Sequence, residues 1–260
     1  MKVIGILQAR TNSTRLPGKV LMKILDEPMI LHQLRRLKRS MLLNDIIVAT
    51  SIEKSDDVLA KVCASAGYRV FRGSLNDVLD RFVKAIGEYE CDHVVRLTAD
   101  CPLTDPKIID EIIEHHLNSN KDYTSNTLKP TYPDGLDAEV FKISALQTAW
   151  KNAVLPSHRE HVTPYIYKNP EVFSLDSYEN AQDMSEMRWT VDEPEDFDFV
   201  TEVYKNLFPI KEDFTMTDIL MLLNDRPEIA LKNSFINRNE GVKKSLIEDA
   251  VFLSNKEEKK

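Results

Sequence analysis

The chain has 260 residues, of which 42% are hydrophobic and 29% are charged, and it carries a formal net charge of −8 at pH 7. This length allows a sizeable core, and the acidic balance argues against a general nucleic-acid-binding protein, whose surface is normally basic. The chain has no apolar run of about 18 residues, no signal-peptide pattern in residues 1–25 and no CxxC spacing among its three cysteines, which predicts a cytoplasmic protein without membrane segments.

Strands and helices alternate between residues 3 and 117. Apolar runs predict strands at residues 3–8, 45–50, 68–71 and 92–97. Amphipathic or capped segments predict helices at residues 29–39, 55–66, 76–89 and 106–117. Asp105 and Pro106 are a typical start for the last of these helices. Because this order of elements produces parallel neighbours, we predict an α/β fold with a mostly parallel sheet.

The alternation weakens after Asn118. Extended segments are predicted at residues 139–141, 173–178 and 187–191, and helices at residues 144–153, 158–168, 194–207 and 215–224. We therefore expect a single domain over residues 1–245 with an irregular insert around residues 120–180, which would form a lid or a dimer contact. Residues 246–260 are expected to form a C-terminal tail with a charged, frayed end.

The loop after the first strand concentrates positive charge and hydroxyl groups. It contains three cations, two hydroxyl side chains and a tight turn: Arg10, Arg15, Lys19, Ser13, Thr14 and Pro17-Gly18. Arginine forks and a lysine charge suit a triphosphate, and open α/β sheets bind phosphates after a strand. The alternative is a solvated basic turn. Because the Walker and dinucleotide patterns, GxxxxGK[ST] and GxGxxG, are absent, a phosphate site here would be of another kind.

Two aspartates are predicted at strand ends. Asp100 follows one apolar strand and Asp192 follows another, 92 positions later. Mg²⁺ commonly binds one or two carboxylates together with phosphate oxygens, so the two aspartates could converge on one ion. The alternative for Asp100 is a turn residue. The alternative for Asp192 or Glu193 is a cap of the helix that begins at Pro194.

The string from Gln8 to Lys19 resembles the opening signature of a known family, the spore-coat polysaccharide cytidylyltransferases. Their relatives are the 3-deoxy-manno-octulosonate and acylneuraminate cytidylyltransferases. The resemblance implies a Rossmann-like sheet of the nucleotide-diphospho-sugar transferase type, with the loop around the triphosphate of CTP. It also implies that the family's two metal-binding aspartates correspond to Asp100 and Asp192, with Mg²⁺ as the cofactor.

The same resemblance implies roles for further residues. The catalytic residues would be Lys19, Arg15, Asp100 and Asp192, and the nucleotide-binding residues would be Ala9, Arg10, Ser13, Arg72, Ser74 and Thr98. Arg72-Gly73-Ser74 resembles the family's base-recognition turn, and Arg72 can donate to O2 and N3 of cytosine. The alternative is a plain turn. Asp80 and Arg81, a little further along, are expected mainly on a helix surface.

Two polar clusters, at residues 133–139 and 158–161, are predicted to bind the sugar. Asp134, Glu139 and His161 carry groups that can hydrogen-bond sugar hydroxyls, and both clusters resemble stretches typical of the spore-coat branch. The alternative is that these clusters form a solvated turn or a dimer contact. The sequence is therefore also compatible with a homodimer.

These features together predict a cytidylyltransferase that uses CTP to activate a sugar or sugar acid as a CMP-sugar with release of pyrophosphate, for surface or spore-coat polysaccharide synthesis. Its partners would be these small molecules, not nucleic acid or a membrane. One alternative is a nucleotide-sugar-dependent glycosyltransferase of the same fold, which has less need of three cations for a triphosphate. The other is a non-catalytic nucleotide-binding protein, which would tolerate the loss of Asp192.

Overall fold

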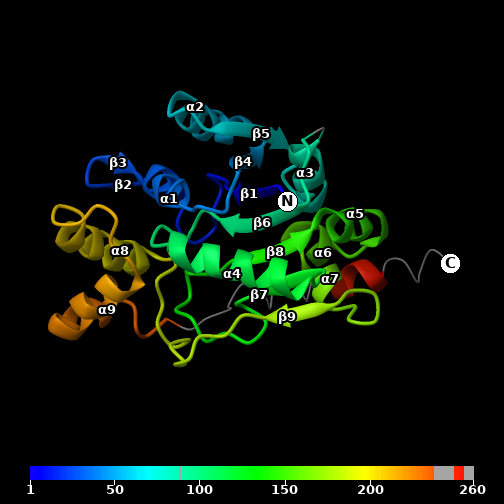
Figure 1. Ribbon diagram of the computed structural model, residues 1–260. Helices are drawn as coiled ribbons and strands as arrows, with labels where there is room; N and C mark the ends of the chain where they lie inside the picture. The colour runs from blue at the N-terminus through cyan, green and yellow to red at the C-terminus, as the bar shows by residue number, and fades with distance from the viewer. Residues whose placement is uncertain (88, 237–248, 255–260) are drawn as a thin grey trace.

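A seven-stranded sheet forms the centre of the molecule (Figure 1). The computed structural model describes residues 1–87, 89–236 and 249–254. In sheet order the strands are β5 (Arg69–Gly73), β4 (Asp45–Ser51), β1 (Val3–Gln8), β6 (His93–Thr98), β8 (Glu139–Lys142), β7 (Tyr123–Ser125) and β9 (Leu175–Ser177). A separate antiparallel hairpin consists of β2 (Lys23–Ile24) and β3 (Glu27–Pro28).

The sheet has a parallel half (β5, β4, β1 and β6) and a second half (β8, β7 and β9), which we call the antiparallel half after β8, although β7 and β9 are parallel to each other. Strands β5, β4, β1 and β6 run parallel to one another, whereas β8 is antiparallel to both of its neighbours, β6 and β7. Strands β1 and β4 are buried on both faces, which is why their sequences are almost continuously apolar. The predicted α/β fold with a mostly parallel sheet is confirmed. The parallel half brings the carboxyl ends of four strands to one edge, where open α/β sheets bind their ligands.

Helices cover both faces of the sheet. They are α1 (Met29–Leu37), α2 (Asp57–Ser65), α3 (Val78–Ile86), α4 (Pro106–Ser119), α5 (Ile143–Asn152), α6 (Pro156–His161), α7 (Pro164–Tyr167), α8 (Pro194–Leu207), α9 (Met216–Asp225) and α10 (Pro227–Ala230), with short 3₁₀ turns at Lys19–Leu21 and Lys54–Asp56. One core cluster joins the sheet to α1, α2, α4, α8 and α9, and a second joins it to α3, α5 and α7. Successive residues of β1 alternate between the two clusters, as the period of a strand requires.

Residues 158–168 form two short helices, not the single helix that the sequence predicts. Val162, between α6 and α7, has a φ of +71°, in the left-handed region that interrupts a right-handed helix. Pro164 has no backbone N–H to continue the hydrogen bonds of α6, and it stands at the first position of α7, where this lack costs nothing. The break ends α6 at His161.

Residues 187–191 cross the carboxyl edge of the sheet, so the prediction of a strand is wrong there. Within the described chain their pairing is an isolated bridge between Asp134 and Arg188. Strand β6 already pairs with β1 on one side and with β8 on the other, so neither side of β6 is open to another strand. The backbone N–H of Val191 instead donates to the carbonyl oxygen of Asp100 at 2.8 Å. This crossing brings Asp192 next to Asp100.

The last described residues, 249–254, are helical and contact α6. Asp249 accepts hydrogen bonds from the backbone N–H and the hydroxyl of Ser157, at 3.0 and 2.6 Å. This part of the predicted tail is therefore attached to the domain, while residues 246–248 and 255–260 lie outside the described residues. In the part of the chain that the structure describes, no helix is both long and apolar enough to cross a membrane.

Candidate active site

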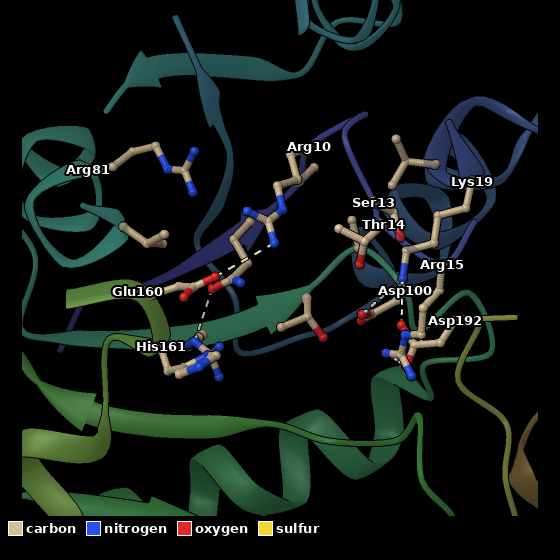
Figure 2. Close-up of a pocket in the computed structure, with 17 residues that line it drawn as sticks. Arg10, Ser13, Thr14, Arg15, Lys19, Arg81, Asp100, Glu160, His161 and Asp192 are labelled. Atoms are coloured by element: carbon tan, nitrogen blue, oxygen red, sulfur yellow. Dashed lines mark hydrogen bonds and ion pairs between the residues drawn. The ribbon is translucent and has the colours of Figure 1, made fainter. Parts of the chain in front are cut away.

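A cavity of about 360 Å³ lies at the carboxyl edge of the parallel strands (Figure 2). One end is formed by the loop after β1, and the other by charged side chains from α3, β6 and α6. Nine of the residues predicted from the sequence line it: Ala9, Arg10, Ser13, Arg15, Lys19, Thr98, Asp100, His161 and Asp192. The fold thus brings together residues from both ends of the chain in one hollow.

Hydrogen bonds to a buried aspartate fix the conformation of the loop after β1. Asp56 accepts hydrogen bonds from the N–H and the hydroxyl of Thr11, at 2.8 and 2.7 Å, and from the N–H and hydroxyl of Ser51. Burial alone would raise the pKa of Asp56, but these hydrogen bonds outweigh it and lower the pKa. The loop closes on itself through Gly18, whose φ of +74° suits glycine and whose N–H donates to the carbonyl of Thr11.

The ammonium group of Lys19 lies between the two predicted metal ligands. It is 2.9 Å from Asp192 Oδ1 and 3.4 Å from Asp100 Oδ2, and it donates to the carbonyl of Val191 at 2.7 Å. Burial would lower the pKa of Lys19, but the two carboxylates outweigh it and raise the pKa. Burial would likewise raise the pKa of Asp100, and the charge of Lys19 keeps it lowered. Lys19 and Asp100 are therefore both charged at neutral pH.

Asp192 is not needed as a helix cap. Helix α8 begins with a capping box of Glu193 and Asp196, and Asp196 Oδ2 accepts the backbone N–H groups of both Asp192 and Glu193 at 3.0 Å. The side chain of Asp192 instead faces cations: besides Lys19, Arg15 lies 2.8 Å from it. Glu193 and Asp196 therefore cap α8, and the side chain of Asp192 does not.

Asp100 and Asp192 fit a divalent cation. Each has an oxygen within 3.4 Å of the Lys19 nitrogen, so the two carboxylates already face a common positive charge. No cluster of three or more His, Cys, Asp or Glu side chains that could hold a metal occurs among the described residues. Two carboxylates without further protein ligands match Mg²⁺ bound together with substrate phosphates, because Mg²⁺ is often held in this way.

The far end of the cavity is formed by a buried charge network. Arg96 on β6 lines the cavity and pairs with Glu139 on β8. The hydroxyl of Tyr123 donates to the other oxygen of Glu139 at 2.7 Å. Glu139 is 8% exposed and lies behind Arg96, not in the cavity lining. Its predicted contact with a sugar would therefore have to be made through Arg96, whereas His161 faces the cavity directly.

Three predicted residues lie elsewhere. The guanidinium of Arg72 donates to the backbone carbonyls of Ser51 and Glu53 at 2.9 and 3.0 Å and pairs with Asp57 at 2.7 Å. Arg72 and Ser74 line a separate cavity of about 440 Å³ beyond β5. Asp134 pairs with Arg188 at 3.4 Å and does not line the first cavity. The structure thus places Arg72 and Ser74 apart from the others, whereas Asp134 is linked to Asp192 because both lie 3.4 Å from the guanidinium of Arg188.

Several residues that line the cavity, above all Arg81, were not predicted from the sequence as site residues. Arg81 was expected on a helix surface, but it is 2% exposed and lines the cavity, so that expectation is wrong. The spacing in the sequence could have indicated its burial. Arg81 lies one turn after Val78 and one turn before Ala85, on the buried face of α3. Arg96 was also missed, although a charged residue within a buried strand indicates a paired or functional group.

The family follows from comparison with known sequences. A family model described as Cytidylyltransferase matches residues 4–216 of the chain. The chain belongs to this family. The matched range contains the loop after β1 together with Asp100 and Asp192, and the cytidylyltransferase is accordingly a CTP-dependent nucleotidyltransferase.

Relatives cover almost the whole cytidylyltransferase chain. Protein MJ1063 of Methanocaldococcus jannaschii, described as uncharacterized, is 43% identical over 242 residues, which are 92% of this chain and 97% of that protein. The spore coat polysaccharide biosynthesis protein SpsF of Bacillus subtilis is 32% identical over 88% of this chain and 96% of its own. The solved structure of a cytidylyltransferase from Leptospira borgpetersenii serovar Hardjo-bovis is 34% identical, with a TM-score of 0.85, and covers 92% of this chain and 100% of that one. The predicted resemblance and the predicted fold type are confirmed.

Proposed function

We propose that this cytidylyltransferase transfers CMP from CTP to a hydroxyl group of a sugar or sugar acid and releases pyrophosphate. The observation that carries the proposal is the Lys19 cluster: a cationic loop after β1 converges with two aspartates from separate segments at one end of a cavity. This arrangement supplies positive charge for a triphosphate and two carboxylates for a cation at the same place.

In this proposal the loop binds the nucleotide. Arg15 and Lys19 stabilise the negative charge of the departing pyrophosphate, while Arg10, Ser13 and the backbone at Ala9 hold the rest of the nucleotide. Thr98, at the end of β6, lines the floor of the cavity. The acceptor oxygen attacks the α-phosphate in line, so the protein acts by positioning the reactants and by stabilising charge.

Asp100 and Asp192 would hold the Mg²⁺ ion. When bound, Mg²⁺ supplies positive charge to the phosphate and lowers the pKa of the attacking hydroxyl. Lys19, which lies between the two carboxylates in this structure, would then be free to contact the phosphates, because its flexible stem can redirect the ammonium group.

The acceptor would bind at the far end of the cavity. His161 can hydrogen-bond a sugar hydroxyl or pair with an acidic group, and Glu139 orients Arg96 for the same purpose. Asp134 would act from outside the cavity by fixing Arg188. The name of the B. subtilis relative, a spore coat polysaccharide biosynthesis protein, supports a sugar as the acceptor and a polysaccharide as the final product.

A pyrophosphate-release assay tests the proposal. The enzyme is incubated with CTP, Mg²⁺ and single members of a panel of sugar acids and neutral sugars, with Asp100→Asn as the inactive control. We expect acceptor-dependent pyrophosphate release from CTP and formation of a CMP-sugar. A parallel incubation replaces CTP by a nucleotide-sugar, and transfer of its sugar to an acceptor without pyrophosphate would support a glycosyltransferase. CTP binding without turnover across the panel would support a nucleotide-binding protein.

A further inference from the structure

Arg188 is a buried arginine whose guanidinium contacts three aspartates. Its side chain is 6% exposed. Asp196 accepts two hydrogen bonds from it, from Nε and from Nη2, both at 2.8 Å. Asp134 and Asp192 each lie 3.4 Å from the same guanidinium. The two parallel hydrogen bonds to Asp196 form a bidentate pair, which fixes the orientation of the planar group.

The pair of Arg188 and Asp196 is itself held in place. Asp196 is fully buried and accepts a hydrogen bond from the side-chain amide of Asn233 at 2.9 Å. The same amide donates to the backbone carbonyl of Arg188 at 2.9 Å. Because a buried ion pair is costly to separate, Arg188 stays beside Asp192 when a ligand enters the cavity.

The turn at residues 133–135 fixes the backbone of the crossing segment, residues 187–191. The N–H of Trp189 donates to the carbonyl oxygen of Asp134 at 2.6 Å. Gly135 has a φ of +114°, and a Cβ atom there would lie 2.6 Å from the carbonyl carbon of Trp189. A side chain at Gly135 would therefore push the turn away from the crossing segment, which leads directly into Asp192.

These contacts determine which oxygen of Asp192 faces Asp100. Arg188 and Arg15 both contact Oδ2 of Asp192, at 3.4 and 2.8 Å. Oδ1 of the same carboxylate lies 2.9 Å from the Lys19 nitrogen, which in turn lies 3.4 Å from Asp100. In the proposed function Arg15, which is 34% exposed, contacts the pyrophosphate instead, and Arg188 remains beside Oδ2.

We propose that Arg188, held by Asp196 and by the turn at residues 133–135, is a positioning residue that keeps Oδ1 of Asp192 turned toward the cation site. The proposal rests on the proposed function in taking Asp192 as a ligand of Mg²⁺. Polar groups behind a metal ligand commonly fix its orientation in this way. Asp134 and Asp196 balance the charge of Arg188, so the negative charge of Asp192 is still available to a cation.

The dependence of CTP binding on Mg²⁺ measures this positioning without turnover. CTP is titrated calorimetrically into the enzyme without acceptor, once with Mg²⁺ and once with EDTA, and the ratio of the two affinities is the metal gain. We expect a metal gain in the wild type and its loss in Asp192→Asn. Arg188→Gln should lower the gain by about 10- to 100-fold, or to one if the wild-type gain is smaller, with CTP affinity in EDTA nearly unchanged.

The sign of the effect separates positioning from charge. Removing a positive charge beside a carboxylate strengthens the attraction of that carboxylate for a cation. If Arg188 acted by charge alone, Arg188→Gln would raise the metal gain and Arg188→Lys would keep it. The fork geometry is lost in both variants, so we expect both to lower the gain. An increased or unchanged gain in folded Arg188→Gln would overturn the proposal.

Two further substitutions act on Asp192 without removing Arg188, and they test the proposal even if Arg188→Gln does not fold. Asp134→Asn keeps the shape but removes one charge from the network, and it should lower the metal gain by about 2- to 5-fold, the range of a weak ion pair. Gly135→Ala displaces the crossing segment and should lower the gain more. An unchanged gain in both variants would overturn the proposal.

Arg36→Gln is the matched control for a general loss of stability. Arg36 on α1 is 3% exposed and donates to the backbone carbonyls of Thr104 and Phe214 at 2.7 and 2.9 Å. Its substitution should lower the unfolding temperature and keep the metal gain. An equal loss of the gain in Arg36→Gln would overturn the proposal, because the loss would then follow from reduced stability. Thermal unfolding establishes that each variant is folded.

Failure of this proposal is distinguishable from failure of the proposed function. A metal gain that is absent in the wild type, or kept in Asp192→Asn, would contradict the metal site of the proposed function and this inference with it. If Asp192→Asn loses the gain and the Arg188 variants keep it, the inference alone fails. Because no acceptor is present, the result does not depend on which sugar the enzyme uses.

Discussion

The parallel and antiparallel halves of the sheet use their charged residues differently around one cavity. On the parallel side, the side chains of Arg10 and Arg15 are 46% and 34% exposed. Where the antiparallel side begins, Arg96 on β6 and Glu139 on the neighbouring β8 are 13% and 10% exposed and pair with each other. An exposed ion pair is weak and can be exchanged for a ligand, whereas breaking a buried pair leaves an uncompensated charge. The parallel side is thus suited to bind and release phosphates, and the antiparallel side to hold a fixed shape.

Removing a carboxylate where the two halves meet should have the largest effect. Asp100→Asn and Asp192→Asn each remove one negative charge with little change of shape, and we expect turnover to fall by roughly 10²-fold or more. Steady-state pyrophosphate release measures this. Asp198→Asn, an exposed aspartate on α8, is the matched control. A near-normal rate for Asp192→Asn would show that Asp192 only positions Lys19 and Arg15.

Substitution of the loop cations should weaken the binding of CTP more than that of CMP, because CTP carries the β- and γ-phosphates. Arg15→Ala and Lys19→Ala each remove a charged donor, and we expect the affinity for CTP to fall by about 10- to 100-fold and that for CMP by less than about 3-fold. Competition binding with the two nucleotides measures the difference. Arg15→Ala is the cleaner variant, because Lys19 is 8% exposed and its loss leaves two carboxylates unpaired. Equal losses for CTP and CMP would place both residues away from the β- and γ-phosphates.

The junction between the halves should also make the fold sensitive to acid. His116 on α4 is fully buried and shares hydrogen bonds with His93 on β6 and Thr124 on β7. Burial, reinforced by His93 and Lys142, lowers the pKa of His116 to about 4 and outweighs the opposite effect of Asp122. Below the usual histidine pKa of about 6.5, the unfolded chain therefore binds a proton that the folded protein does not.

Stability should therefore be greatest above pH 6.5 and fall as the pH decreases toward 4. The expected loss from this residue is of the order of 2 kcal/mol between pH 7 and pH 5, measurable by urea unfolding at both values. In His116→Gln the part due to this residue should disappear. His115→Gln, at the neighbouring half-exposed histidine, should keep it. An unchanged pH dependence in His116→Gln would contradict the assignment.

The acceptor end should show the smallest effect, confined to the second substrate. His161→Ala removes one hydrogen-bonding group, and we expect the acceptor KM to rise by about 2- to 10-fold with CTP affinity nearly unchanged. Glu139→Gln should act in the same direction through Arg96, at some cost in stability because it breaks a buried pair. Acceptor titration beside CTP calorimetry separates the two substrates. Loss of CTP binding in His161→Ala would refute an acceptor site there.

The parallel half was predictable from the sequence because its strands are continuous apolar runs and its helices are capped and amphipathic. The loop after β1 and Asp100 could be located for the same reason, since both follow strong strands. The antiparallel half was harder to predict: β7 and β9 have three residues each, too few for a periodic pattern. Arg81 was misjudged because charge alone suggests a surface position, and its burial depends on the space left by Gly73.

The contacts of Lys19 also bear on the order in which the molecule folds. Its ammonium group joins residues that lie 81, 172 and 173 positions further along the chain. Contacts over such separations close large loops, whose entropy must be lost before the contacts can form, so they are slow to form. A chain that ends before residue 188 would contain the loop and Asp100 but none of the C-terminal groups that hold Lys19. The nucleotide site is therefore completed only when the C-terminal part of the chain has folded across the sheet.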